Sequence, residues 1–230
     1  MALILNLETA TTVCSVALAE DSQLLVLKEV NGDYTHAENL TNFVEQATQE
    51  AGFSLTDVDA ISVSKGPGSY TGLRIGVSTA KGLCYALDKP LIAINTLEHS
   101  AYGCSVKTGE ADDLFCPMID ARRMEVYCAV YDKLNRVIRS TAAEIIEEHS
   151  FHELLEKHRI YFFGDGAEKC KSVLAKHSNA LFIDRLYPSA SNMIALSELA
   201  FKANSFEDVA YFEPFYLKDF VAGKKKGEVL

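Results

Sequence analysis

The stretch AISVSKGPGSYTGLRIGVSTAKGLCYAL, residues Ala60–Leu87, sets the local architecture from which the rest of the chain can be read. Ala60–Ser64 is a short apolar run that predicts a buried strand, and Gly72–Leu87 has the length of a helix. The loop between them carries Gly66, Gly68 and Ser69, where glycines permit positive φ or close backbone approach and the helix start can hold an anion. No Gly-Lys-Ser/Thr follows, so this is not a Walker loop. From the residue types alone, a tight turn that only sets the direction of the next helix is slightly favoured over an anion site.

The elements on either side of this stretch follow one order twice. Three strands, a helix, a strand, a helix, a strand and a helix are expected in each half of the chain, and two capping boxes, Thr35 with Glu38 and Ser150 with Glu153, support two of the helix starts. The expected strands are Ala2–Leu7, Thr12–Ala19, Leu24–Val30, Ala60–Ser64 and Leu91–Ile94, then Leu114–Ile119, Glu125–Tyr131, Arg136–Thr141, Arg159–Phe163 and Leu181–Ile183. The expected helices are 35–51, Gly72–Leu87 and Thr96–Tyr102, then 150–158, Ala167–Lys176 and Ser191–Asn204.

This repeated order predicts an α/β protein with two mixed-sheet subdomains. Three meandering strands followed by alternating helices and strands give a mixed sheet covered by helices. The doubled unit is the architecture of the actin-like, sugar-kinase and Hsp70-ATPase (ribonuclease H-like) fold. We expect the subdomains to span residues 1–105 and 106–212, followed by a tail at 213–230, with a ligand cleft between the halves.

Composition narrows the function classes. With 48% hydrophobic and 23% charged residues the chain is of ordinary globular type. Its net charge of -10 disfavours phosphate-backbone binding by the chain alone, and the basic run Lys224–Lys226 is read first as a solvated tail. No apolar stretch is long enough to span a membrane, and the N-terminus lacks a signal-peptide pattern. Six scattered cysteines are typical of buried thiols in a reducing cytoplasm.

The helix after the glycine loop has small residues on one face. Gly72, Gly76 and Ala80 recur every four residues, with Cys84 next. Each glycine costs a helix about 0.8–1 kcal/mol relative to alanine, so a packing reason is expected. Small side chains allow another helix to approach closely. Either a partner meets one face of this helix, or both faces are buried within the chain.

The turn after the first strand occupies the place where actin-like ATPases hold a phosphate. Those enzymes usually read Asp-x-Gly-Thr, whereas this chain has Glu8 and Ala10 in the acid and glycine positions, next to Thr9 and Thr11. Because the alanine Cβ disfavours close approach, the site is weakened. In the second half, Gly164 and Gly166 form a weaker candidate nucleotide cradle.

Metal chemistry has little support in the sequence. His36 has Leu40 four residues later, although a helical metal pair needs histidine at both positions. His152-Glu153-Leu154-Leu155-Glu156 departs from H-E-x-x-H in its last letter, and His149 is read as a surface group. The charged turn Asp120–Tyr127 fits either a binding turn or an exposed, ion-paired one.

Together these motifs resemble one known family. Leu7–Thr11, His36, KGPGSYTGLRIGVSTAKGL at Lys65–Leu83 and IDARRMEVY at Ile119–Tyr127 are similar, in this order, to the bacterial TsaB (YeaZ) family. The likeness is weaker after about residue 130. The family turn usually begins with Asp, where this chain has Glu8.

The resemblance implies a non-catalytic scaffold or activator subunit in tRNA threonylcarbamoyladenosine synthesis. It implies that the chain binds the TsaD paralogue, which has two metal-binding histidines and modifies the adenosine next to the anticodon. It also implies that the TsaE ATPase joins these two proteins and that TsaC supplies the threonylcarbamoyl-adenylate. It places the partner surface on the two long helices of the first half. The residues assigned to this surface are His36, Leu40, Phe43, Val44, Ala47, Gly72, Ile75, Gly76, Thr79, Ala80 and Leu83.

Several alternatives remain open from the sequence. A nucleotide-binding ATPase or kinase of the same fold would need a working phosphate turn, and a metallopeptidase would need a second helical ligand at Leu40. No cofactor is required for the scaffold role, and residual ATP or ADP binding is left open. We expect a cytoplasmic protein that forms a homodimer when alone and meets tRNA through the complex.

Overall fold

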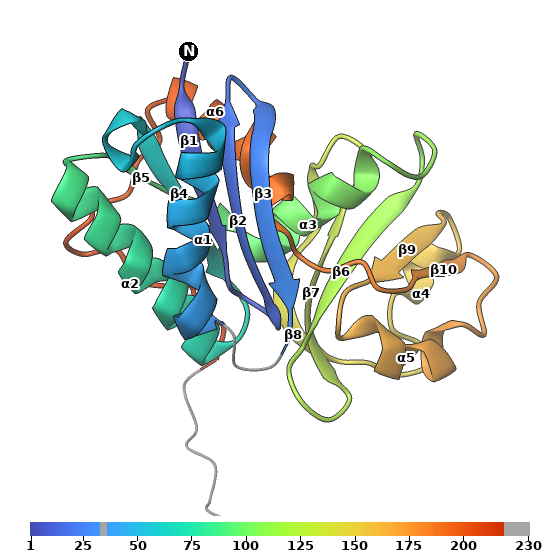
Figure 1. Cartoon of the computed structure of the whole chain (residues 1–230). Helices are drawn as coiled ribbons and strands as arrows, with labels where there is room; N and C mark the ends of the chain where they lie inside the picture. Colours follow the sequence, from blue (N-terminus) through green and yellow to red (C-terminus); the bar gives the residue numbers. More distant parts are fainter. Residues whose placement is uncertain (33–35, 219–230) are drawn as a thin grey trace, which may run out of the picture.

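The first five strands form one mixed sheet in the computed structural model, which describes residues 1–32 and 36–218 (Figure 1). The strand order is β3-β2-β1-β4-β5, and β1 pairs antiparallel with β2 and parallel with β4. Leu5 lies at the centre, opposite Leu18 on one side and Ile61 on the other. The strands are β1 (Leu3–Glu8), β2 (Val13–Glu20), β3 (Gln23–Asn31), β4 (Ala60–Gly66) and β5 (Leu91–Asn95).

The second sheet repeats this arrangement. Its order is β10-β9-β6-β7-β8, in which β6 pairs antiparallel with β7 and parallel with β9. Each sheet thus has a three-strand meander extended by parallel strands, as the sequence order predicts. The strands are β6 (Leu114–Asp120), β7 (Glu125–Tyr131), β8 (Val137–Ile145), β9 (Ile160–Phe163) and β10 (Ala180–Ile183).

Two long helices, α1 (His36–Ala51) and α2 (Tyr70–Leu87), cover one face of the first sheet (Figure 1). Their apolar residues join the strands in a single core, which includes Leu40 and Val77. The Ser69 side chain caps α2 by accepting a hydrogen bond from the Gly72 amide, and Asp88 in a left-handed conformation ends it. Within 1–32 and 36–218, no helix has the length and apolarity needed to cross a bilayer.

The helices that end each half are exchanged between the sheets. α3 (Thr96–Ser105) follows the first sheet in sequence, but its Leu97 and Ala101 pack with Phe115 and Phe163 of the second. α6 (Ile194–Lys202), with the short helix η2 (Ala190–Met193), returns to the first sheet, where Met193 contacts Ile4 and Ile92. Periodicity marks a helix without saying which sheet it covers, so this exchange is not predicted by the sequence, and the subdomain bounds at residues 105 and 212 stay predictions.

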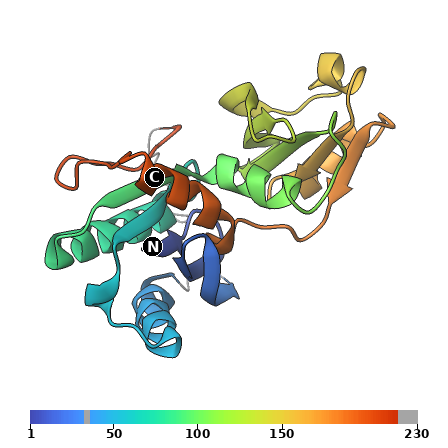
Figure 2. The same ribbon diagram turned by 90° about the horizontal axis from the view of Figure 1, so that it is seen from above.

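The segment after α6 lies along the first sheet and α2, as Figure 2 shows from above. The Glu207 amide donates to the Leu91 carbonyl at 2.8 Å, and the Phe215 amide donates to the Lys65 carbonyl at 2.7 Å. Lys81 of α2 donates to the Phe212 carbonyl at 2.9 Å. The expected tail beginning at residue 213 is thus, up to residue 218, part of the first unit.

Smaller helices complete the two units. They are η1 (Leu55–Asp57), α4 (His152–Leu155) and α5 (Ala167–Leu174). The predicted capping box at Ser150 and Glu153 is wrong: the Ser150 hydroxyl accepts from the Glu147 amide at 2.9 Å, and Phe151 in a left-handed conformation precedes a helix of only four residues. The Thr35 half of the other predicted capping box lies outside the described residues.

Candidate functional site

The turn between β1 and β2 is buried and polar, and it is the centre of the candidate site. Glu8 is 0% exposed, and its two carboxyl oxygens have separate partners inside the protein. One accepts from the Ala10 amide at 2.5 Å, and the other lies 2.6 Å from Nε2 of His99, which is also fully buried. Both carboxyl oxygens are thus engaged by the chain itself.

Two threonines of this turn, Thr9 and Thr11, form hydrogen bonds with the long helices. The Thr9 hydroxyl donates to the Gly72 carbonyl in α2 at 2.8 Å. Nε2 of His36, at the start of α1, donates to the Thr11 carbonyl at 2.7 Å. The turn therefore has direct hydrogen bonds to α1, to α2 and, through His99, to α3.

The glycine-rich loop packs against the same turn. The Ser69 amide donates to the Ala10 carbonyl at 2.7 Å. A Cβ built on Gly68, Gly72 or Gly76 would lie closer than 3.0 Å to atoms of Ala10 or Thr9, a distance that real side chains essentially never reach. The predicted need for close approach is confirmed at Gly72 and Gly76, but the approaching group is this chain's own turn rather than a partner helix.

These contacts do not fit a magnesium–phosphate group at the turn. A metal would need a carboxylate oxygen free to bind it, and a phosphate would need free backbone N–H groups. Here one Glu8 oxygen accepts from the Ala10 amide and the other is bonded to His99, and protein atoms already fill the space next to the loop glycines.

Burial, together with the nearby Glu8 carboxyl, raises the pKa of the Cys14 thiol to about 11.

The second candidate cradle also packs against protein. A Cβ on Gly164 or Gly166 would lie closer than 3.0 Å to the backbone of β6, at Met118 and Ile119 respectively. Between them, Asp165 accepts a hydrogen bond from the Asp120 amide at 3.0 Å, and burial raises the pKa of the Asp165 carboxyl. These glycines let the loop lie directly on the strand. Nucleotide binding here stays a prediction.

The residues assigned to the partner surface divide into two groups. Most lie in the interior between the helices and the sheet, where they contact their own chain: His36, Leu40, Val44, Ala47, Gly72, Gly76 and Ala80. The other four are half-buried along α1 and α2: Phe43, Ile75, Thr79 and Leu83. The first group can therefore support a partner surface from beneath, and the second can contact a partner directly.

A second set of small residues on α2, which sequence reasoning missed, faces outward. Ser78, Gly82 and Ala86 are exposed and recur every four residues. A Cβ on Gly82 would meet nothing within 4 Å. The spacing that singled out the Gly72 face was equally present here, but periodicity alone does not say which of the two faces turns inward. Tyr85, 87% exposed, flanks this surface.

The histidines lie in different places and carry no metal-binding geometry. His149 and His152 line a hollow of about 190 Å³ in the second unit, far from the turn in sequence, and His152 pairs with Glu156 at 3.2 Å. Among the described residues, no group of three or more His, Cys, Asp or Glu side chains is placed to hold a metal ion. All six cysteines are buried free thiols.

Comparisons with known proteins agree with this architecture. The family model described as TsaD, tRNA N6-adenosine threonylcarbamoyltransferase, matches residues 33–226. The tRNA threonylcarbamoyladenosine biosynthesis protein TsaB of Escherichia coli (strain K12) is 32% identical over 228 residues, covering 96% of this chain and 97% of that protein.

Solved structures match over most of the chain as well. YeaZ from Pseudomonas aeruginosa has a TM-score of 0.81 at 27% identity, covering 94% of this chain and 100% of that one. An activator of 2-hydroxyisocaproyl-CoA dehydratase from Clostridium difficile has a TM-score of 0.52 at 8% identity over 88% of this chain and 96% of that one, a likeness of fold alone. The predicted duplicated actin-like fold is confirmed. The chain therefore belongs to the TsaB (YeaZ) family and is related in sequence to the TsaD threonylcarbamoyltransferases.

Proposed function

We propose that this chain is a non-catalytic subunit in the biosynthesis of threonylcarbamoyladenosine in tRNA, and that it binds and supports a TsaD-type threonylcarbamoyltransferase. Family membership supports the pathway. The observation that carries the non-catalytic role is the closed turn, where Glu8 binds Ala10 and His99 instead of presenting a free carboxylate. Because atoms of the chain itself fill the turn where a phosphate would bind, we expect the chain to support the reaction by binding the transferase rather than by catalysing a step.

The proposed partner surface is the outward side of α1 and α2. It combines the half-buried Phe43, Ile75, Thr79 and Leu83 with the exposed small residues Ser78, Gly82 and Ala86. Small residues permit close helix approach, and flanking apolar residues provide area to bury. A surface of this kind fits a pair of helices from a relative with the same fold, and the same surface pairs two copies of this chain when the relative is absent.

The remaining members of the assembly follow from the family resemblance. We propose that a TsaE-type ATPase joins the pair and that tRNA binds the assembled complex in the cytoplasm. The buried free thiols are consistent with a reducing compartment. Any ATP or ADP would bind at the joint surface, since the turn of this chain is occupied by protein atoms.

Gly82→Leu is the sharpest test of this surface. A Cβ at Gly82 meets nothing in its own chain, and replacing a helical glycine favours folding, so the variant is expected to be folded and at least as stable as the parent. Its added bulk stands where the partner helix would approach. Gel filtration and calorimetry with the threonylcarbamoyltransferase are expected to show loss of the complex.

Ser172→Leu is the matched control, because it adds comparable bulk to an exposed position of α5 in the other unit. This control is expected to bind the partner normally. A folded Gly82→Leu protein that forms the complex with unchanged affinity would refute the assignment of the surface. Threonylcarbamoyl transfer to tRNA by the purified chain alone would refute the non-catalytic role.

A further inference from the structure

A cluster of arginine and tyrosine side chains lies where the two units meet, at one end of the molecule. Arg74 and Tyr70 come from the first turns of α2, and Tyr216 comes from the segment that follows α6. Arg122 and Arg123 come from the hairpin between β6 and β7. These five residues are called the arginine–tyrosine patch below.

Several side-chain contacts link the members of the patch. The rings of Tyr70 and Tyr216 lie 4.8 Å apart, and the Arg74 guanidinium lies 4.4 Å above the Tyr70 ring. The Tyr216 hydroxyl is hydrogen-bonded to Arg74. Two residues further along, Lys218 pairs with Glu125 in the hairpin that carries Arg122. The segment at 216–218 thus connects the tyrosine pair to the hairpin.

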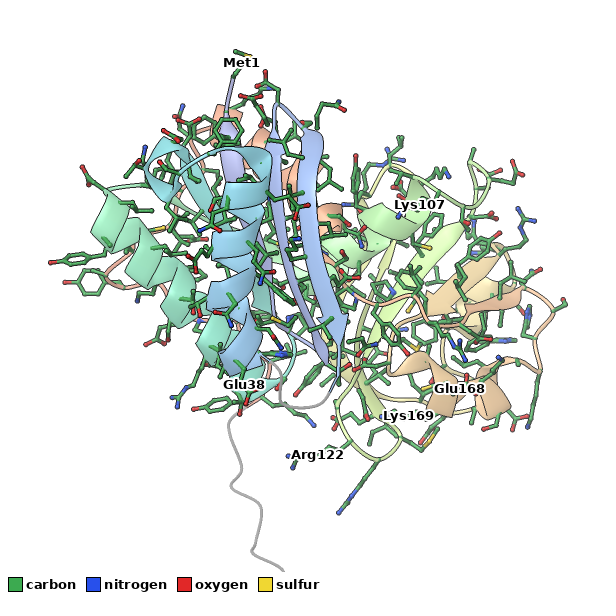
Figure 3. All side chains as sticks on the ribbon, viewed as in Figure 1. Met1, Glu38, Lys107, Arg122, Glu168 and Lys169 are labelled. Carbon is green, nitrogen blue, oxygen red and sulfur yellow. The ribbon has the colours of Figure 1, made fainter. Side chains whose placement is uncertain are left out.

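The hairpin arginines are presented to solvent without a counter-charge. Both are exposed, and both have left-handed backbones, with φ of 71° at Arg122 and 48° at Arg123. Such φ values are uncommon for residues other than glycine and are enriched at functional positions. Within residues 1–32 and 36–218, neither guanidinium forms an ion pair, while the neighbouring Asp120 is held by Lys169. Figure 3 shows Arg122 projecting away from the body of the protein.

The positive charge of this end stands out in a chain of net charge -10. The acidic side chains of the hairpin, Asp120 and Glu125, are each neutralised by a lysine. Glu38 at the start of α1 and Glu168 in the first turn of α5 are exposed carboxylates toward this end (Figure 3), and Glu168 lies 3.9 Å from Lys171. The three arginines of the patch therefore leave an excess of positive charge at this end of the molecule. Arginine suits phosphate oxygens because its planar guanidinium group donates two parallel hydrogen bonds.

We propose that the arginine–tyrosine patch contacts the phosphate backbone and a loop nucleotide of the tRNA that the complex modifies. This inference rests on the proposed function and adds a direct RNA contact made by this chain. Arginines alone would fit any acidic surface, but the two adjacent tyrosine rings beside Arg74, tilted by 34° to each other, favour RNA, because unpaired bases stack on aromatic rings and on guanidinium planes. The patch also spans both units, so a bound RNA would bridge them.

The test uses the full chain assembled with the threonylcarbamoyltransferase and an unmodified tRNA transcript. The double variant Arg122→Asn/Arg123→Asn removes both charges, while asparagine tolerates the left-handed backbone. Fluorescence anisotropy is expected to show roughly tenfold weaker tRNA binding at about 0.1 M salt, with the slope of log K against log salt reduced by about one per arginine. Arg74→Gln is expected to weaken binding in the same direction.

The control is Lys107→Gln/Lys157→Gln, which removes the same charge from exposed positions elsewhere, Lys107 lying at the opposite end of the molecule (Figure 3). It is expected to leave the affinity and the salt slope unchanged. Equal affinity of the double arginine variant and the parent at all salt concentrations overturns the inference, and so does an equal loss of tRNA affinity in the control.

Gel filtration of the same samples distinguishes failure of the RNA contact from failure of the proposed protein complex. If the complex forms but tRNA affinity does not change, the RNA contact fails alone; if the arginine variant loses the protein partner instead, the patch is a protein contact and the inference is wrong.

Discussion

Gly76→Ala and Gly82→Ala are expected to change stability in opposite directions, although both glycines lie in the same helix. Replacing a helical glycine by alanine contributes about 0.8–1 kcal/mol of stability from helix propensity in either case. At Gly82 the new methyl meets nothing within 4 Å, so the whole gain is expected to remain. For a chain of this length it corresponds to a rise in Tm of about 2–4 °C.

At Gly76 the new methyl collides with the Thr9 hydroxyl. The Cβ would lie closer than 3.0 Å to Thr9 Oγ1, which is buried and donates to the Gly72 carbonyl at 2.8 Å. Overpacking costs about 1–3 kcal/mol, and displacing the buried hydroxyl from its acceptor costs about 1–3 kcal/mol more. After the propensity gain is subtracted, we expect a net loss of about 3 kcal/mol, or a fall in Tm of about 6–12 °C.

Thr9→Ala provides the second arm of a double-mutant cycle. It removes Oγ1, and the Thr9 Cβ that remains lies 3.4 Å from the new methyl, which is tight but tolerable. Gly76→Ala should therefore cost at least 1 kcal/mol less in the Thr9→Ala background than in the parent. Urea unfolding of the four proteins, followed by circular dichroism, measures this coupling. A coupling near zero, or equal midpoints for Gly76→Ala and Gly82→Ala, contradicts the packing described here.

Three further predictions concern buried titratable groups. His99→Ala leaves a Glu8 carboxyl oxygen buried without its partner and is expected to lower the free energy of unfolding by about 3 kcal/mol, measured by urea titration, whereas an unchanged midpoint means that the pair does not form. Burial raises the pKa of the Asp165 carboxyl in the folded state, so the folded protein loses stability as pH rises through that pKa. Asp165→Asn keeps an oxygen acceptor for the Asp120 amide but does not titrate, so the stability of this variant relative to the parent should increase between pH 4 and pH 7. A difference in stability that does not change with pH contradicts this prediction. Burial raises the pKa of the Cys14 and Cys84 thiols to about 11, so a thiol reagent at pH 8 should label the native chain far more slowly than the urea-unfolded chain, and rapid labelling without denaturant argues against the buried assignment.

The strand and helix order was predictable because it depends on local patterns. Glu125–Tyr131 was predicted with the bounds that the structure has, and β1 and α2 were displaced by two residues or fewer. The exchange of α3 and α6 between the sheets could not be predicted in the same way. The choice of sheet depends on contacts between residues that are distant in sequence, such as the packing of Met193 with Ile4, and local periodicity does not contain this information.

The candidate site was predictable in its residues but less so in its geometry. The spacing of Gly72 and Gly76 indicated close approach, and the structure has it, with Thr9 as the approaching residue. The partner of Glu8 could not be inferred, because His99 is 91 positions away and no motif links the two. The sequence showed only that Glu8 stands where the family turn usually has an aspartate. In the structure, its two oxygens instead satisfy a backbone amide and an imidazole.

The retained turn has a structural reason that does not depend on catalysis. Thr9 and Thr11 bind the helices that carry the proposed partner surface, and Glu8 binds His99 of α3, which packs on the second sheet. The structure therefore constrains these residues whether or not the turn binds a phosphate, because each substitution would remove a buried polar contact to a helix. A substitution in this turn is therefore expected to disturb the positions of α1, α2 and α3 together.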